Sequence, residues 1–255
     1  MRTKFSFSLL LIVLILPLSQ AEANTAKFRN TTDVTITIFA ASSLSSAFLA
    51  IAREFEIRDP SVHVRFSFLA SSVLATQLSA GAPADIFAAA SKPDMLAAAS
   101  RVPVHRFFAS NRIVLAVAKN GHIPITKLQD LNQRKIKWIQ CAHSVACGVA
   151  TDTALKSLKI ITTRPVSLEA KVSSVVAKLI DREVDAAFIY HSDFVANSKI
   201  LREIAFPESI SSKTRYFIGV VKDSEKLIAS KRFVNEVLSP RGQKLLSQSG
   251  FGGAR

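Results

Sequence analysis

The sequence predicts an α/β protein of two similar lobes, each built on a mostly parallel sheet flanked by helices. Apolar or β-branched runs alternate with segments whose apolar residues recur at helical spacing, a pattern that is typical of βαβ units. Two short apolar stretches, at 84–88 (ADIFA) and 184–189 (VDAAFI), each follow a predicted helix. This similarity indicates that the second half of the chain echoes the first.

The first half of the chain alternates strands and helices. Residues 34–39 (VTITIF) are β-branched and predict a strand, and the apolar spacing that follows predicts a helix in which Ser42 or Ser43 is a natural N-cap. The predicted elements are a strand at 34–39, a helix at 44–57, a strand at 62–68, a helix that ends at Gly81, a strand at 85–90 and a helix that opens at Ser91.

The second half continues the alternation. Its predicted elements are strands at 113–118, 136–139, 185–190 and 216–221, and helices at 148–158, 173–183 and within 224–248. The runs near 110–118 and 213–222 are interpreted as two crossings between lobes. We therefore expect lobe I to comprise residues 33–112 plus 213–255, and lobe II to comprise residues 113–212.

The N-terminus has the pattern of an export signal. Arg2 and Lys4 precede an apolar run, and Ala21-Glu22-Ala23 fits a signal-peptidase site, so residues 1–23 are expected to be a signal peptide. A retained membrane anchor is the alternative, although the run is shorter than the roughly 20 residues that a spanning helix needs. An exported location follows in either case, in the periplasm or at the extracytoplasmic cell surface.

The composition and motifs exclude several function classes. The formal charge is +14, but the basic residues are dispersed rather than interleaved with aromatic ones, so no nucleic-acid partner is expected. No phosphate-binding loop, nucleophile elbow or zinc-protease motif occurs, and the five histidines lack metal-ligand spacing. No enzyme activity and no cofactor are predicted.

Two strand-to-helix turns are rich in small hydroxyl residues. Ser42 and Ser43 follow the strand at 34–39, and Ser71 and Ser72 follow the strand at 62–68. Helix N-termini offer free N–H groups and a partial positive charge, and serine hydroxyls add donors, so such turns are suited to anions. Simple helix capping is the alternative. Two similar turns at the carboxyl ends of parallel strands favour a ligand site.

Three segments resemble the molybdate-binding proteins of bacterial ABC importers. These are residues 37–44 (TIFAASSL), 79–87 (SAGAPADIF) and 184–193 (VDAAFIYHSD), and the similarity runs from about residue 34 to residue 252. The resemblance implies a two-lobe, type II periplasmic-binding-protein fold with the ligand in the interlobe cleft. It further implies a monomer that captures molybdate or tungstate and delivers it to the membrane permease subunits of an ABC importer.

The resemblance also implies which residues bind the ligand. Their uncharged groups donate hydrogen bonds to the oxyanion, and no side chain binds the metal atom directly. The hydroxyls of Ser43, Ser71 and Tyr190 and the backbone amides of Cys147 and Val172 take these positions. Each has a structural alternative: the serines as caps alone, Tyr190 as a core aromatic residue, and Val172 as an apolar helix start. The chain departs from the family at Ala146, Lys171 and His191, which adjoin the expected site.

A pocket with only donors favours a fully deprotonated oxyanion. Hydrogen bonds to a charged group contribute about 1.5–3 kcal/mol each. Phosphate still carries a proton near neutral pH and needs an acceptor, which none of the five positions supplies as a carboxylate. Molybdate, tungstate or sulfate is therefore favoured, and a binding protein for another tetrahedral oxyanion such as sulfate is the alternative function.

The two cysteines, Cys141 and Cys147, flank the loop that is expected to carry one amide ligand. Nearby cysteines in an oxidising compartment usually pair, so a disulfide is possible, and two free buried thiols are the alternative.

Two further functional classes compete with the interpretation as a binding protein. A sensor domain of a transcription regulator would carry a helix-turn-helix and no export signal, and a secreted hydrolase would need a catalytic site.

Overall fold

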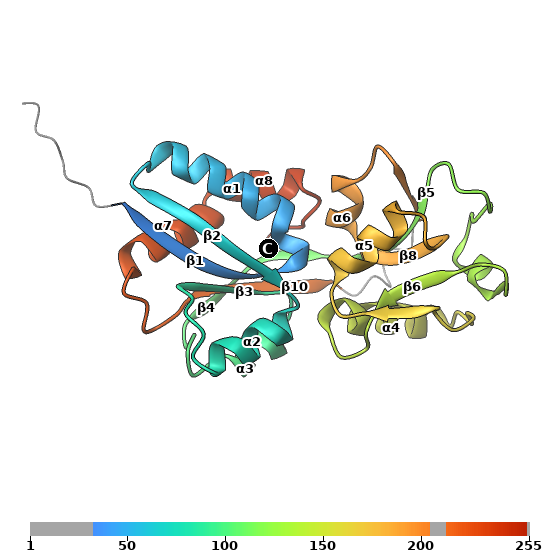
Figure 1. The fold of residues 1–255 in the computed structure, drawn as a ribbon, viewed down its shortest axis with the longest axis horizontal. Coiled ribbons are helices and arrows are strands. Elements are labelled where there is room, and N and C mark those ends of the chain that lie inside the picture. The colour runs from blue at the N-terminus through green and yellow to red at the C-terminus, as the bar shows by residue number, and fades with distance from the viewer. Residues whose placement is uncertain (1–32, 205–212, 254–255) are drawn as a thin grey trace, which may run out of the picture. The chain divides into compact units, whose positions relative to one another are not determined.

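The fold consists of two five-stranded sheets with helices packed around each (Figure 1). It is seen in a computed structural model that describes residues 33–204 and 213–253. The predicted signal peptide, residues 1–23, lies outside the described residues. Within the described ranges, no helix is long and apolar enough to cross a membrane.

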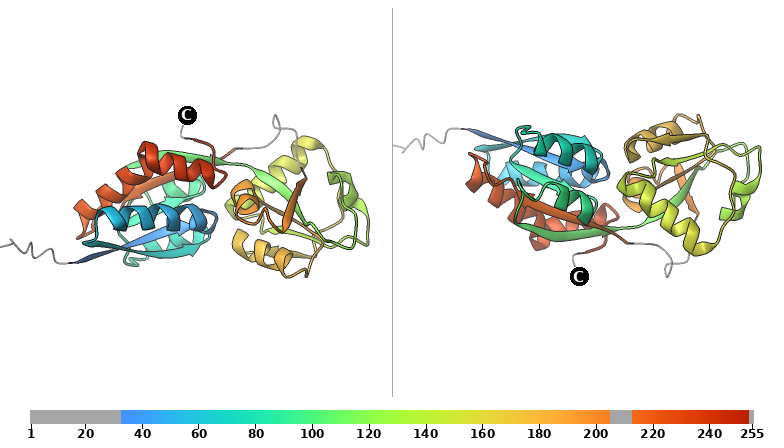
Figure 2. Two further views of the ribbon diagram at one scale, coloured as in Figure 1. Left: turned by 90° about the horizontal axis from the view of Figure 1, so that it is seen from above. Right: turned by 90° about the horizontal axis from the view of Figure 1, so that it is seen from below.

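The first sheet has the strand order β2-β1-β3-β10-β4. Its strands are β1 (Val34–Ala41), β2 (Val62–Leu69), β3 (Ile86–Ala89), β4 (His105–Asn111) and β10 (Thr214–Val220). Helices α1 (Ser45–Arg58), α7 (Leu227–Leu238) and α8 (Pro240–Gln248) cover one face, and α2 (Ser71–Ser79) and α3 (Lys92–Ala97) cover the other (Figures 1 and 2). The 3₁₀ helix η1 (Ser42–Leu44) joins β1 to α1.

The second sheet repeats this plan with the order β7-β6-β8-β5-β9. Its strands are β5 (Ile113–Ala118), β6 (Trp138–Cys141), β7 (Ser167–Glu169), β8 (Ala186–Tyr190) and β9 (Leu201–Ile204). The accompanying helices are η2 (Leu128–Asn132), α4 (Ala146–Leu158), α5 (Val172–Ile180) and α6 (His191–Ala196). In both sheets three parallel strands are followed by one that runs in the opposite direction (β10 or β5) and by an edge strand that runs with the first three (β4 or β9). This shared plan confirms the predicted α/β class and the echo between the halves.

An aspartate makes the same contact at the start of the third strand of each sheet. The Oδ2 atom of Asp85 accepts a hydrogen bond from the backbone N–H of Thr37 at 2.7 Å, and the N–H of Asp85 donates to the carbonyl of Thr37. Asp185 forms the equivalent pair with Lys137, at 2.8 Å for each bond. The aspartate therefore ties the third strand in each sheet order to its neighbour, β3 to β1 in the first sheet and β8 to β6 in the second.

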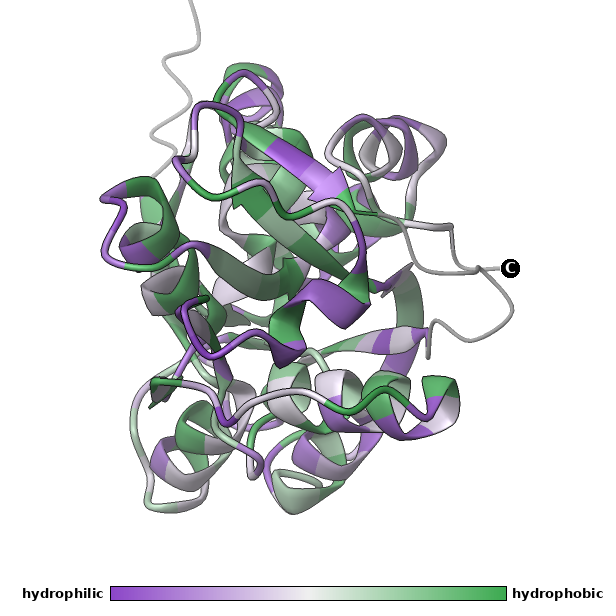
Figure 3. Ribbon diagram, turned by 90° about the vertical axis from the view of Figure 1, so that its right-hand side faces the viewer, coloured by the Kyte–Doolittle hydropathy of each residue, from purple (hydrophilic) through white to green (hydrophobic). Residues whose placement is uncertain are grey.

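Each sheet has its own apolar core. In the first, the Phe48 ring centroid lies 5.8 Å from that of Phe108 and 6.1 Å from that of Phe233. In the second, Trp138 packs edge-on against Phe188 at 5.5 Å. Hydrophobic residues concentrate on the central strands in Figure 3, as expected for strands covered on both faces.

Several local predictions need correction. Ser42 and Ser43 do not cap the helix at 44–57, because both lie in the 3₁₀ turn η1 and Leu44 precedes α1 without a side-chain cap. Strands β4, β7 and β9 and helix α6 were not predicted. The mostly parallel character is confirmed, because four of the five described strands in each sheet run in one direction and β10 or β5 runs against them.

The chain changes sheet between β4 and β5 and again between β9 and β10. Residues 205–212, in the second change, lie outside the described ranges. The lobe boundaries at 112/113 and 212/213 therefore stay a prediction.

Candidate functional site

A small cavity is lined by segments that belong to both sheets. Its volume is about 20 Å³, above the roughly 10–15 Å³ that one water requires and far below the pockets of about 300–1,000 Å³ that hold organic ligands. All five residues predicted to bind the anion line it. The lining residues are Ala41, Ser42, Ser43, Leu69, Ala70, Ser71, Ala90, Val145, Ala146, Cys147, Lys171, Val172 and Tyr190.

Four helices begin at this cavity. They are η1 at Ser42, α2 at Ser71, α4 at Ala146 and α5 at Val172, and none of the four has a side-chain cap. The first N–H groups of a helix have no intrahelical partner and carry a partial positive charge. The cavity is therefore a place where an anion meets backbone donors from four directions.

The Ser71 hydroxyl has its acceptor side occupied. Its Oγ atom accepts a hydrogen bond from the backbone N–H of Ala90 at 2.9 Å, and both residues line the cavity. Because Ser71 is buried, its own proton remains available for a partner in the cavity. Ser71 is the first residue of α2 rather than its cap, which removes the capping alternative for this serine.

The Ser43 hydroxyl lies 2.9 Å from the hydroxyl of Tyr216, a buried residue of β10. This contact joins residues 173 positions apart in the chain and was not predicted from the sequence. Ser43 is only 5% exposed and faces the cavity from the first sheet. Its hydroxyl is therefore held on one side by a tyrosine that does not itself line the cavity.

Tyr190 reaches the cavity from the end of β8 in the second sheet. Its hydroxyl is buried and lies near Thr214 and Tyr216, but it makes no hydrogen bond of regular geometry within the described residues. Burial raises the pKa of Tyr190 well above its ordinary value, so the hydroxyl stays protonated. A buried, unpaired O–H group is costly to the fold and is available to a ligand.

The amide of Cys147 is held in a closed loop. Cys141 and Cys147 form a disulfide with a Cα–Cα distance of 5.7 Å, which confirms the predicted pair. Gly148 follows, where a side chain would meet the carbonyl oxygen of Ala142 at 2.0 Å. The disulfide and this close approach together fix the first turn of α4 against the loop.

The cavity has a weakly positive lining. Among the described residues that line it, none is acidic and Lys171 is the one charged residue. His191, another departure from the family pattern, lies elsewhere: its Nδ1 atom is 2.9 Å from Glu203, which also pairs with Arg112 at 2.7 Å. Lys171 is therefore a departure from the family pattern that lies at the cavity itself, whereas His191 belongs to a neighbouring cluster with Glu203 and Arg112.

The acid nearest to Tyr190 along the chain is Asp193, whose carboxylate accepts the backbone N–H of Tyr190 at 3.1 Å. Burial raises the pKa of Asp193 to about 7, although this backbone hydrogen bond acts in the opposite direction. The carboxyl group is therefore partly protonated near neutral pH, which reduces its repulsion of an anion beside Tyr190.

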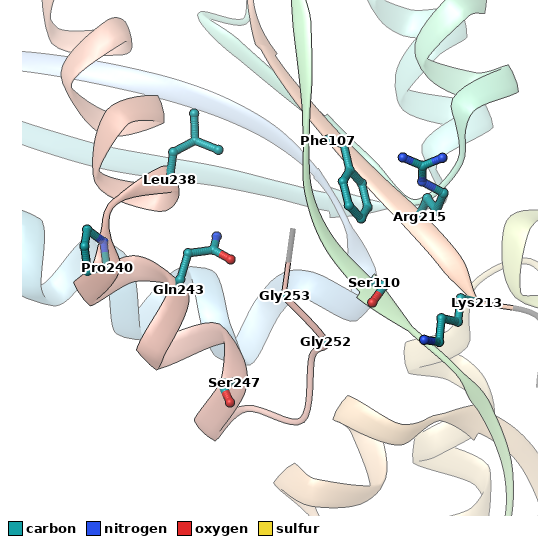
Figure 4. Close-up of a pocket in the computed structure, with 10 residues that line it drawn as sticks. All are labelled: Phe107, Ser110, Lys213, Arg215, Leu238, Pro240, Gln243, Ser247, Gly252 and Gly253. Atoms are coloured by element: carbon teal, nitrogen blue, oxygen red, sulfur yellow. The ribbon is translucent and has the colours of Figure 1, made fainter. Parts of the chain in front are cut away.

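A second, much larger groove lies away from these residues. It has a volume of about 980 Å³ and runs between β4 and β10 on one side and α8 and the C-terminal segment on the other (Figure 4). None of the five predicted residues lines it. Within the described ranges there is also no cluster of three metal-ligating side chains.

Comparison of the chain with known proteins shows the family to which it belongs. The profile of the bacterial extracellular solute-binding proteins matches residues 36–252, which is most of the chain. The chain belongs to the bacterial extracellular solute-binding proteins. Members of this family bind solutes outside the cytoplasm, so the expectations of an extracytoplasmic protein that is not an enzyme are both confirmed at this level.

Individual members of this solute-binding family agree with that assignment. The molybdate-binding protein ModA of Mycobacterium tuberculosis is 36% identical over 219 residues, covering 85% of this chain and 84% of that protein. A solved substrate-binding domain of a putative molybdenum ABC transporter from Clostridium difficile has a TM-score of 0.65 and 25% identity, covering 87% of this chain and 99% of that one. The periplasmic molybdate-binding protein of Azotobacter vinelandii has a TM-score of 0.71 at 14% identity, with coverages of 85% and 98%, and this likeness confirms the two-lobe fold.

The most recognisable motif of the sequence lies outside the cavity. Residues 81–85 (GAPAD) are absent from its lining, and Asp85 instead holds β1 and accepts the Ser224 hydroxyl at 2.7 Å. This motif therefore maintains the fold of the solute-binding protein. The serine turns and the loop at Cys147 are the segments that form the cavity.

Proposed function

We propose that the protein captures molybdate or tungstate outside the cytoplasm and delivers it to an ABC importer. The observation that carries this proposal is the small cavity between the two sheets, which is lined by donors from four helix N-termini and by no acidic residue. The 36% identity to a molybdate-binding relative over most of both chains supports the same solute.

The proposed ligands are the hydroxyls of Ser43, Ser71 and Tyr190 and the amides of Cys147 and Val172. A dianionic tetrahedral oxyanion has only acceptor atoms, and donors from both sheets satisfy them without a counter-charge. Because hydrogen bonds to a charged group contribute about 1.5–3 kcal/mol each, five of them supply enough energy for strong binding. The oxyanion is cargo, and no resident cofactor is involved.

Delivery follows from the two-lobe plan. An anion held by donors from both lobes favours the closed arrangement, and hinge closure around a ligand is the usual conformational change of such proteins. We propose that the closed monomer docks on the membrane permease subunits of the importer. We also propose that the working protein is in the periplasm or at the cell surface, with residues 1–23 as the export signal.

Calorimetric titration with four oxyanions tests the solute. Molybdate and tungstate are expected to bind, and phosphate is expected to bind far more weakly because its proton needs an acceptor. Sulfate shares the full set of acceptors, and only the size of the cavity separates it from molybdate. Binding of sulfate without molybdate would replace the proposed solute by the alternative oxyanion.

A matched pair of variants tests the site. Ser71→Ala removes a cavity hydroxyl and is expected to weaken molybdate binding about 10- to 100-fold, the loss of one hydrogen bond to a charged group. Ser72→Ala changes the neighbouring residue, which does not line the cavity, and is expected to change the affinity less than about twofold. Equal affinities for the two variants would contradict the assignment of the cavity.

A further inference from the structure

Tyr216 lies directly behind the cavity and contacts both lobes of the proposed site. Its ring is fully buried and packs edge-on against Phe108 at 6.2 Å and against Phe251 at 5.4 Å. On its other side it meets Tyr190 at 6.2 Å with an interplanar angle of 66°. The aromatic contacts from the first sheet therefore hold the Tyr216 hydroxyl in place beside Ser43 and Tyr190.

Either hydroxyl can donate in the contact between Tyr216 and Ser43, and the surrounding groups favour Tyr216 as the donor. Burial raises the pKa of Tyr216 well above its ordinary value, and the nearby Tyr190 and Asp193 raise it further, so the hydroxyl keeps its proton. The Ser43 Oγ atom, at 2.9 Å, is the acceptor within reach of that proton. A serine oxygen that accepts in this way still has its own proton to give.

The side chain of Asn111 supports this direction. Its Oδ1 atom accepts the backbone N–H of Arg112 at 2.9 Å, so its NH₂ group points the other way and donates to Ser192 at 2.8 Å. The same amide lies beside the Tyr216 hydroxyl and acts to lower its pKa, against the larger effect of burial. An NH₂ group on this side of the Tyr216 oxygen favours donation of the Tyr216 proton to Ser43.

We propose that Tyr216 is a positioning residue for the anion site: its hydroxyl donates to Ser43 and thereby directs the Ser43 proton into the cavity. This inference rests on the proposed function, because it concerns the same site. It adds a residue that the expected ligand set does not contain, and it gives Ser43 the role of a donor to the anion.

This arrangement also contributes to selectivity. With one lone pair of its oxygen engaged by Tyr216 and its own proton directed at the anion, Ser43 is a weaker acceptor for the proton of hydrogen phosphate. Without the Tyr216 hydroxyl, the Ser43 hydroxyl is free to rotate and to accept. The preference for molybdate over phosphate is therefore expected to narrow in a Tyr216→Phe variant, which a merely structural role of Tyr216 does not predict.

A double-mutant cycle on the full mature chain tests the inference. Molybdate affinity is measured for the wild type, Tyr216→Phe, Ser43→Ala and the double variant, with phosphate titrated into the first two. Tyr216→Phe is expected to weaken molybdate binding about 3- to 20-fold when Ser43 is present and less than about twofold when it is absent. The phosphate-to-molybdate ratio of dissociation constants is expected to fall in Tyr216→Phe.

Ser230→Ala is the control for loss of a buried hydroxyl, because Ser230 is fully buried on α7 away from the cavity. Thermal unfolding without ligand reports whether each variant folds. Unchanged molybdate affinity in Tyr216→Phe, or an equal loss with and without Ser43, overturns the inference while wild-type binding leaves the proposed function intact. A wild type that binds none of the four oxyanions overturns both.

Discussion

Tyr190 is a residue whose two roles oppose each other. Its ring completes the packing at the end of β8, where it is 1% exposed, yet its hydroxyl has no regular hydrogen bond within the described residues. An unpaired buried hydroxyl costs about 1–3 kcal/mol. A protein that keeps such a group without a ligand gives up stability for binding, as functional sites commonly do.

Tyr190→Phe is therefore expected to separate stability from affinity. The free energy of unfolding without ligand should stay equal or increase by up to about 1–2 kcal/mol, because the unpaired hydroxyl is removed and the ring is kept. Molybdate affinity should fall about 10-fold or more. Urea unfolding and calorimetry on the same preparation measure the two quantities, and a variant that is both less stable and unchanged in affinity would assign Tyr190 to the core alone.

At the scale of residues, the resemblance to the molybdate-binding proteins predicted which five positions meet, and all five line one cavity. Each of them lies at or near the start of a helix or the end of a strand. The resemblance did not supply the contacts between other residues that are far apart in the chain. The pairing of Ser43 with Tyr216 depends on how β10 returns to the first sheet, and no spacing along the chain encodes that return.

At the scale of elements, the disulfide closes the loop between β6 and α4. Cys147 is the second residue of α4, and its amide belongs to the same turn that the bond holds. A covalent closure reduces the ordering that an anion would otherwise need to impose when it binds. The loop between β6 and α4 therefore links the redox state of the two cysteines to the position of the Cys147 backbone N–H group.

Replacing both cysteines by serine is expected to lower the free energy of unfolding by about 2 kcal/mol, from the chain entropy of so short a loop. The backbone amide remains, so molybdate should still bind, with an affinity reduced about 3- to 10-fold by the added ordering cost. Reduction of the wild type with a thiol reagent should reproduce the loss, and the same reagent should leave the double variant unchanged. An affinity that is indifferent to both treatments would show that the loop is ordered without the bond.

Helix α6 carries a carboxyl group that titrates near neutral pH. Burial raises the pKa of Asp193 from 3.8 to about 7 in the folded chain. Between these two values the folded state binds more protons than the unfolded state, so the contribution of Asp193 to stability is lost as the pH rises from about 4 to about 7. The group destabilises the folded state most above neutral pH.

Asp193→Asn keeps an acceptor for the Tyr190 N–H group and removes the charge. The variant should be more stable than the wild type, and this gain in the free energy of unfolding should be larger at pH 8 than at pH 5. Chemical denaturation at the two values measures this difference, and Asp181→Asn, at an exposed acid on the end of α5, is the matched control. A difference that does not change with pH would mean that Asp193 is already ionised at pH 5.

The elements that were predicted have strong apolar patterns, and the missed ones do not. β7 is three residues long with none buried, and β9 (LREI) buries its first and last residues over only four positions. Such edge strands take their structure from a neighbouring strand rather than from their own composition. The 3₁₀ turn at Ser42 was missed for a similar reason, because a capping serine and a serine in a 3₁₀ turn look alike in sequence.

For the whole molecule, a ligand held by both sheets links binding to global stability. An anion that binds only the folded chain stabilises it by RT ln(1 + [L]/Kd), or about 2.7 kcal/mol at 100 times Kd. The melting temperature should therefore rise with molybdate concentration and continue to rise above saturation. Phosphate at the same ionic strength is the control, and equal shifts with both ions would indicate a salt effect in place of specific binding.

The bond between Cys141 and Cys147 also has a consequence for when the protein becomes active. Disulfides of this kind form and persist in oxidising compartments, whereas the bacterial cytosol keeps thiols reduced. A newly made chain that has not yet left the cell interior would therefore carry its binding loop unclosed. Its affinity for the oxyanion would therefore stay about 3- to 10-fold lower until the bond forms in an oxidising compartment.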